Sequence, residues 1–144
     1  MILGIGTDIV NCERFERPLK SYREKFLRKV LTNAEISYAE EKLAPLQSFL
    51  GDAAALKHLS LIVGKIFAAK EAFVKALGTG FRNGVRLQDI EVRRTKQGKP
   101  YFHVVGHTKH VLDNLSPIGM HSEVHLTLSD DAPYATAYVI ICAI

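Results

Sequence analysis

The sequence has few of the features that stabilise a small secreted protein or anchor a protein in a membrane. It holds only two cysteines, Cys12 and Cys142, without a Cys-x-x-Cys spacing, so neither a disulfide framework nor a cysteine-based zinc site is predicted. No stretch approaches the roughly 18 consecutive apolar residues of a membrane span, and no basic region followed by a long apolar run opens the chain. We therefore expect a cytoplasmic protein with no part in a membrane.

What the sequence does contain is enough apolar material for one core and an excess of positive charge. Hydrophobic residues make up 47% of its 144 residues, which predicts a single domain over residues 1–144. The formal net charge of +4 favours an acidic partner, which could be a nucleic acid, a phosphorylated cofactor or an acidic protein. The charge alone does not distinguish these classes.

The most regular stretch, residues 64–77, predicts a buried helix. It is rich in alanine and lysine, contains no proline, and Gly78 follows where a left-handed helix cap would lie. Around a 3.6-residue turn, large apolar side chains share one side and alanines the other. Glu71 and Lys75 fall in the narrow polar strip between these sides, as a surface ion pair or as site residues. Lys70 lies on the large apolar side, from which we expect its amine to reach the rim, with a packing or subunit-contact role as the alternative.

The first ten residues, MILGIGTDIV, predict a strand. Alternation places Gly4, Gly6 and Asp8 on one face, and a glycine-lined face is expected where another group approaches closely. Asp8 is then a turn or capping carboxylate, or part of a site. The Gly-x-Gly spacing lacks the third glycine of a dinucleotide-binding fingerprint.

Residues 12–29 form the most basic part of the chain, with apolar residues at helical intervals. We expect an amphipathic helical region that is interrupted near Pro18. Its positive charge makes it a solvated face or a docking surface for an acidic partner.

Two further helical segments are predicted before the central helix. Thr32 and Glu35 match a capping box that opens a helix running through Lys42. Residues 43–63 fit a helix with a loop on either side, leading into the central helix at about Gly64.

The remaining residues predict short antiparallel strands. Gly78, Thr79, Gly80 and Arg82 form a glycine-rich basic loop, which suits phosphate binding or a plain helix ending. Strands are expected at residues 87–93 and 101–105, joined by a hairpin turn, then a short helix at 108–115 and strands at 124–128 and 134–142. The fold class is therefore α+β, with a mainly antiparallel sheet packed around a buried central helix.

Four separated segments together resemble the holo-[acyl-carrier-protein] synthase family, the small phosphopantetheinyl transferases of fatty-acid synthesis. They are GIGTDIV at residues 4–10, FLRKVLTNAE at 26–35, FAAKEAFVKALGTGFRNG at 67–84 and GKPY at 98–101. The closing segment, VHLTLSDDAPYATAYVII, is similar to the last hairpin of the family. The resemblance covers nearly the whole chain and is specific because Asp8 occurs together with Lys70-Glu71 and Gly-Thr-Gly.

The resemblance implies an enzyme that moves the 4'-phosphopantetheine arm of coenzyme A to a serine of apo-acyl carrier protein and releases adenosine 3',5'-bisphosphate. Its catalytic residues would be Asp8, Glu71 and Lys75. Asp8 and Glu71 would bind Mg²⁺ bridged to the coenzyme A diphosphate, and Lys75 would neutralise charge on the leaving group. Either Glu71 or a metal-bound water would accept the serine proton. The residues implied to contact coenzyme A are Lys75, Gly78, Thr79, Gly80, Pro100 and His125.

The resemblance also implies protein partners. The basic segment would dock the strongly acidic acyl carrier protein, through Arg14 first and then Arg17 and Arg23. Family members form homotrimers with a site at each subunit interface, so we expect a homotrimer. His125 matches a family histidine and is a cofactor contact or an ordinary strand histidine.

The sequence departs from the family pattern and leaves two other function classes open. The family arginine before Phe67 is replaced by Ile66, with Lys65 one residue earlier, which puts one phosphate contact in question. Residues 44–64 are also longer and more apolar than the family pattern.

One rival function is that of a small basic nucleic-acid-binding domain. It is disfavoured because the cations are not interleaved with aromatics and paired carboxylates repel phosphates. The other is a non-catalytic coenzyme A-binding scaffold. We expect no nucleic-acid partner.

Overall fold

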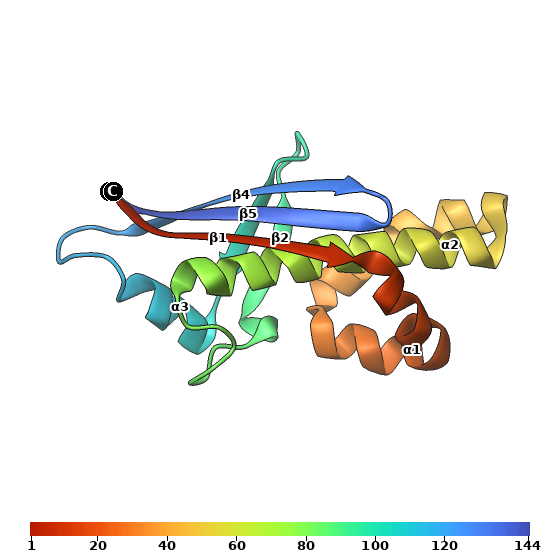
Figure 1. The fold of residues 1–144 in the computed structure, drawn as a ribbon, viewed down its shortest axis with the longest axis horizontal. Helices are drawn as coiled ribbons and strands as arrows, with labels where there is room; N and C mark the ends of the chain where they lie inside the picture. Colours follow the sequence, from red (N-terminus) through yellow and green to blue (C-terminus); the bar gives the residue numbers. More distant parts are fainter.

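The computed structural model describes residues 1–144 and shows a long helix beneath a three-stranded antiparallel sheet (Figure 1). The helix is α2 (Asn33–Leu77), and the sheet contains β1 (Ile2–Asn11), β4 (Ser122–Asp131) and β5 (Tyr134–Ala143). The strand order is β1-β5-β4, so the first strand of the chain pairs with the last. The two termini meet, because the Met1 amino group donates to the Ala143 carbonyl at 2.9 Å.

Strand β1 lies directly on the alanine side of α2. A Cβ atom added at Gly4 would overlap the Ala76 carbonyl oxygen, and one added at Gly6 would overlap that of Ala72. Only glycine allows the two backbones to come this close. The expected close approach to the glycine-lined face is therefore confirmed, and the approaching group is the backbone of the central helix.

Helix α2 consists of two helical parts that reverse direction at Gly51 (Figure 1). Gly51 has φ 80° and ψ 176°, a conformation available essentially to glycine alone, which fixes the reversal there. The prediction of loops on either side of residues 43–63 was wrong. Pro45 lies inside the first part, and Gly64 is buried within the second, which runs without a loop to its left-handed cap at Gly78.

The basic segment forms a short 3₁₀ turn, η1 (Cys12–Phe15), and helix α1 (Glu16–Val30). The break predicted near Pro18 is also misplaced. Pro18 sits in the first turn of α1, where a missing N–H costs no helical hydrogen bond. The kink lies instead at Tyr22, whose φ of −152° and ψ of 52° leave the helical region.

The predicted capping box at the start of α2 is confirmed. The Glu35 amide donates to the Thr32 hydroxyl oxygen at 3.3 Å, and the Thr32 amide donates to Glu35 Oε2 at 2.8 Å. Glu35 is itself 1% exposed, so this carboxylate belongs to the core as well as to the cap.

The rest of the chain forms a second, two-stranded sheet and a short helix. After the 3₁₀ turn η2 (Leu87–Asp89), β2 (Ile90–Arg94) and β3 (Pro100–Val104) pair as the predicted hairpin, and α3 (Gly106–Asp113) follows. The Phe73 and Phe102 rings, with centroids 5.1 Å apart, pack the hairpin onto α2. The α+β class with antiparallel sheets around a central helix is confirmed. None of the helices, long α2 included, is apolar enough over sufficient length to cross a membrane.

Candidate active site

Asp8 and Lys75 meet where β1 crosses the last turns of α2. The Lys75 ammonium donates to Asp8 Oδ1 at 2.7 Å and to the Thr7 carbonyl at 3.0 Å. Alternation along β1 turns Asp8 toward α2, because the glycines on the same face already lie against that helix. The Lys75 side chain is 51% exposed, so solvent and ligands reach this ion pair.

Glu71 lies one helical turn before Lys75 and is half-buried beside the same pair. It accepts no hydrogen bond from the protein, because Lys75 is paired with Asp8 instead. Burial, followed by the negative charge of Asp8, raises the pKa of Glu71, while Lys75 and Arg14 act against the rise. Two carboxylates of like charge thus share one accessible site, an arrangement that favours a bound cation.

The donor set at this site suits a hard divalent cation. No group of three or more histidine, cysteine, aspartate or glutamate side chains is placed to hold a metal, so the protein would contribute only the Asp8 and Glu71 carboxylates. Mg²⁺ is commonly held in this way, by one or two carboxylates together with water and substrate phosphates. The two predicted metal ligands therefore fit Mg²⁺, provided that Lys75 releases Asp8.

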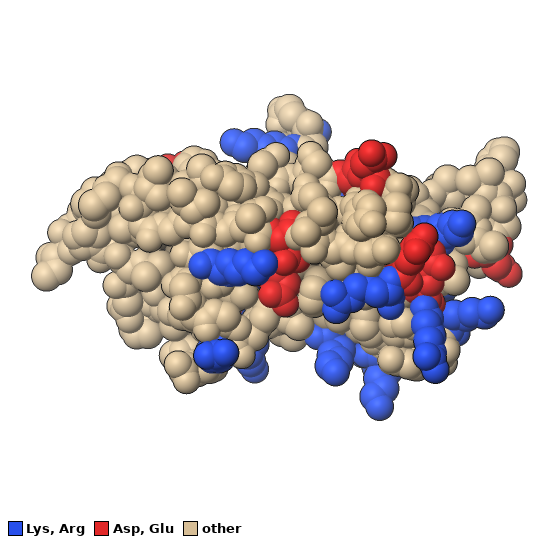
Figure 2. Space-filling model, in the orientation of Figure 1, with Lys and Arg blue, Asp and Glu red and all other residues tan.

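Arg14 approaches the site from η1. Its guanidinium lies 5.3 Å from the Phe15 ring centroid and 5.6 Å from that of Phe67, which is one turn of α2 before Glu71. Arg14 is thus held at the rim of the site. Arg17 and Arg23 are exposed along α1, and Figure 2 shows lysine and arginine side chains gathered over that helix.

The predicted nucleotide wall follows Lys75 at the end of α2. Gly78 has φ 80° and Gly80 has φ 61°, so both occupy the left-handed region that the loop requires. Between them, the Thr79 hydroxyl donates to the Gly80 carbonyl at 2.9 Å. The loop therefore lies about two helical turns from Glu71 along the same helix.

The other two predicted coenzyme contacts lie elsewhere in the protomer. His125 is on β4, at the opposite edge of the sheet from β1, and its side chain is 48% exposed on the face directed away from α2. Pro100 begins β3, which lies beside β4. One protomer therefore does not bring His125 and Pro100 together with Asp8 and Glu71.

The outer face of the three-stranded sheet is uncovered, and β1 and β5 present large apolar side chains on it. Ile5 and Ile9 of β1 are 52% and 66% exposed, and Tyr134 and Tyr138 of β5 are 49% and 42% exposed. A continuous exposed face of this kind is typical of a protein–protein contact. His125 lies on this same face.

The structure places Lys70 in the core, so the expectation that its amine reaches the rim was wrong. Lys70 is 0% exposed, and its ammonium donates to Glu35 Oε2 at 2.7 Å, to the Val30 carbonyl at 3.0 Å and to the Leu87 carbonyl at 3.1 Å. Burial raises the pKa of Glu35 and lowers that of Lys70, against the attraction between the two charges. The capping box identified Glu35, but no sequence signal linked it to a residue so distant along the chain.

Lys65 and Ile66, which depart from the family pattern, have different surroundings. Lys65 pairs with Asp130 near the end of β4 at 3.1 Å. Ile66 lines a hollow of about 330 Å³ beneath the β2–β3 hairpin, next to Arg93 and Arg94. Cationic side chains are thus available beside Ile66, although they come from β2 rather than from α2.

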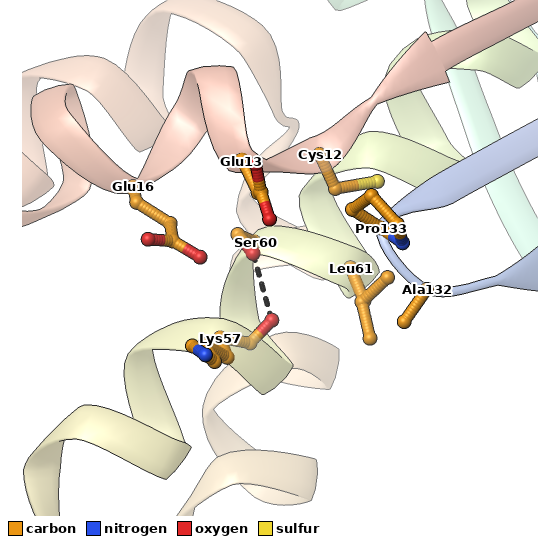
Figure 3. Close-up of a pocket in the computed structure, with 8 residues that line it drawn as sticks. All are labelled: Cys12, Glu13, Glu16, Lys57, Ser60, Leu61, Ala132 and Pro133. Atoms are coloured by element: carbon orange, nitrogen blue, oxygen red, sulfur yellow. Dashed lines mark hydrogen bonds between the residues drawn. The ribbon is translucent and has the colours of Figure 1, made fainter.

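A second cavity, of about 200 Å³, lies where η1, α2 and the β4–β5 turn meet (Figure 3). Figure 3 shows Glu13 and Glu16 on one side, and Lys57 and Ser60, whose hydroxyl donates to the Lys57 carbonyl at 2.7 Å, on the other. None of the predicted site residues lines this cavity. It is lined by Cys12, Glu13, Glu16, Lys57, Ser60, Leu61, Ala132 and Pro133.

Comparison with known proteins shows the family to which the chain belongs. The family model of the 4'-phosphopantetheinyl transferase superfamily matches residues 4–139. The chain belongs to this superfamily. It is 43% identical over 142 residues to the holo-[acyl-carrier-protein] synthase of Wolbachia pipientis, covering 99% of this chain and 98% of that one. It is 39% identical over 144 residues to the synthase of Jannaschia sp., covering 100% of this chain and 87% of that one.

Solved structures of the superfamily share the fold. The crystal structure of the synthase from Neisseria meningitidis matches with a TM-score of 0.75 at 32% identity, covering 99% of both chains. The synthase from Bacillus anthracis, in complex with CoA (3',5'-ADP), matches with a TM-score of 0.70 at 33% identity, covering 98% of this chain and 96% of that one.

Proposed function

We propose that this transferase moves the 4'-phosphopantetheine group of coenzyme A to a serine of apo-acyl carrier protein, in the cytoplasm, and releases adenosine 3',5'-bisphosphate. The observation that carries the proposal is the meeting of Asp8, Glu71 and Lys75 at one accessible site in a chain of this superfamily. The two carboxylates can hold a divalent cation, and the half-exposed Lys75 ammonium can bind a diphosphate.

Asp8 and Glu71 would hold Mg²⁺ between β1 and α2. When bound, the cation would withdraw negative charge from the diphosphate as the bond between phosphorus and the leaving oxygen breaks. Glu71 can take this role directly because its carboxylate accepts no hydrogen bond from the protein. Asp8 must first give up its ion pair with Lys75 before it can bind the cation.

Lys75 would move from Asp8 to the leaving phosphate. Its half-exposed side chain can rotate without breaking core packing, and its charge is needed where the adenosine bisphosphate anion forms. The serine hydroxyl forms the new bond to phosphorus and loses its proton, which Glu71 or water at the site accepts. The loop at residues 78–80 would line the nucleotide.

We propose that the functional unit is a homotrimer in which each site combines two protomers. One protomer would contribute Asp8, Glu71 and Lys75, and its neighbour would contribute His125 and Pro100. The outer face of the sheet supports this arrangement, because it carries His125 on β4 together with large exposed apolar side chains on β1 and β5 that a neighbouring protomer would cover.

The basic surface of α1 would dock the carrier. Acyl carrier protein is acidic, and Arg17 and Arg23 present positive charge on the exposed side of this helix. Arg14 links this surface to the site, since it lies over Phe67 near Glu71.

The test is incubation of the protein with coenzyme A, Mg²⁺ and apo-acyl carrier protein, followed by mass spectrometry of the carrier. The proposal predicts a mass gain of one phosphopantetheine group and formation of adenosine 3',5'-bisphosphate. A folded protein that modifies none of several carriers would refute it. Sedimentation equilibrium of the same preparation tests the trimer separately.

A further inference from the structure

Lys70 ends in a buried site in which every proton of its ammonium is used. The three acceptors are Glu35 Oε2, the Val30 carbonyl and the Leu87 carbonyl, at 2.7, 3.0 and 3.1 Å. An ammonium group has three donors and no acceptor, so no capacity is left over. Lys70 therefore cannot touch coenzyme A or the carrier, and any part it plays in the reaction must act through other residues.

Glu35 is saturated in the same way. Its Oε1 accepts the Val92 amide at 2.7 Å, and its Oε2 accepts both the Thr32 amide at 2.8 Å and the Lys70 ammonium. No buried side-chain polar atom in the protein lacks a partner. A fully satisfied buried network tolerates little displacement, because moving one member leaves another without a partner.

The network joins the docking helix to the site helix. Val30 is the last residue of α1, Glu35 lies in the first turn of α2, and Lys70 immediately precedes Glu71. The kink at Tyr22 separates the part of α1 that bears Arg23 from the part anchored by η1. The Lys70 hydrogen bond to Val30 thus fixes the position of the part of α1 after Tyr22 along the axis of α2.

A buried ion pair is a poor source of net stability, because removing two charges from water offsets most of their attraction. In some proteins such a pair instead selects one arrangement among several that an apolar core would allow. Here the arrangement selected is the position of α1 relative to the turn that carries Glu71.

We propose that Lys70 is a positioning residue that sets the register between the carrier-docking helix α1 and the turn of α2 that bears Glu71, through its bonds to Val30 and Glu35. This inference rests on the proposed function, in which α1 holds the carrier while its serine reaches the site. Coenzyme A does not contact α1 in that scheme. Loss of the register should therefore impair use of the carrier far more than use of coenzyme A.

The experiment measures steady-state kinetics of the double variant Lys70→Met with Glu35→Gln, varying each substrate in turn. The double change removes both charges at once, so neither is left buried and unpaired. We expect the KM for the carrier to rise about tenfold while the KM for coenzyme A changes less than about twofold, because only the carrier senses the register. The wild-type protein is measured alongside, and its failure to transfer would refute the proposed function instead.

Leu112→Ala is the matched control, since Leu112 is a buried core residue of α3, which lies away from α1 (Figure 1). It should lower the thermal midpoint and leave both KM values unchanged. An unchanged carrier KM in the folded double variant, or an equal rise in both KM values, would overturn the inference. If the double variant does not fold, Lys70→Arg, which keeps the charge and alters the geometry, is judged by the same two KM values.

Discussion

Two lysines on the same helix, Lys70 and Lys75, end in ion pairs of opposite character. The Lys70 and Glu35 side chains are 0% and 1% exposed, whereas those of Lys75 and Asp8 are 51% and 15% exposed. Both pairs have the same nitrogen-to-oxygen distance of 2.7 Å, so contact geometry alone does not distinguish them. Burial does.

The difference in burial assigns the two pairs different roles. The Lys70 pair is surrounded by backbone partners and cannot open without leaving a charge in the core, which costs several kcal/mol. The Lys75 pair is open to solvent on the side of the half-exposed lysine, and an ion pair that water reaches contributes about 1 kcal/mol or less, so either partner can be exchanged for a ligand. The first pair therefore holds the structure in place, and the second is ready to rearrange when a cation and a diphosphate arrive.

The largest expected effect lies at the accessible site. Glu71→Gln should lower the rate of phosphopantetheine transfer about 10³-fold, because a neutral amide no longer helps to hold a cation that stabilises the transition state. Transfer is followed by mass spectrometry of the carrier, with circular dichroism to show an unchanged fold. Glu41→Gln, an exposed change elsewhere on α2, is the control and should transfer normally. Wild-type rates in Glu71→Gln would show that this carboxylate is not a ligand.

The next effect separates the two lysines directly. Lys70→Met should lower the free energy of unfolding by about 3–5 kcal/mol, because it leaves Glu35 buried without its cation. Lys75→Met should change the free energy of unfolding by no more than about 1 kcal/mol and should abolish efficient transfer. Urea denaturation measures both. Similar losses of stability in the two variants would erase the distinction drawn here.

A smaller effect concerns the link between α1 and the accessible site. Arg14→Ala should weaken carrier binding about tenfold at low salt and much less at high salt, since exposed charges are screened by ions. Arg14→Lys keeps the charge and should recover most of the low-salt binding. Binding is measured by fluorescence anisotropy of labelled apo-carrier. An affinity that Arg14→Ala leaves unchanged at both salt concentrations would remove Arg14 from the docking surface.

The smallest effect is the pH dependence of metal-free stability. The pKa of Glu71 is raised in the folded protein by burial and by Asp8, so the folded state keeps this proton to higher pH than the unfolded chain does. The wild type therefore loses stability as pH rises from the ordinary glutamate pKa through the raised one, and Glu71→Gln does not. With chelator present, Glu71→Gln should be more stable than wild type at pH 7, by less than about 1 kcal/mol because solvent screens the site, and equally stable at acid pH. A wild type that is the more stable protein at pH 7 would contradict this sign.

The sequence predicted features that depend on neighbours along the chain or on a strict period. The glycine face of β1, the alanine side of α2, the cap at Gly78 and the capping box at Thr32 all follow from local spacing, and the structure contains each. Asp8 and Glu71 could be paired only through family resemblance, because they lie on different elements.

The features that the sequence did not predict depend on long-range packing. Lys70 is buried because the reversal at Gly51 returns α2 along itself and brings Glu35 beside it. The sequence instead predicted a helix over residues 43–63 with a loop on either side, since Pro45 and Gly51 are both helix breakers in isolation. The placement of His125 on the far face of the sheet follows from the register of β4 and β5, which no local pattern fixes.

The most direct test is a crystal structure of the protein with coenzyme A and Mg²⁺. The account predicts that Lys70 keeps its bonds to Glu35, Val30 and Leu87, while Lys75 leaves Asp8 for a phosphate and a cation lies between Asp8 and Glu71. A structure in which Lys75 stays on Asp8 with coenzyme A bound, or in which the Lys70 pair opens instead, would contradict it.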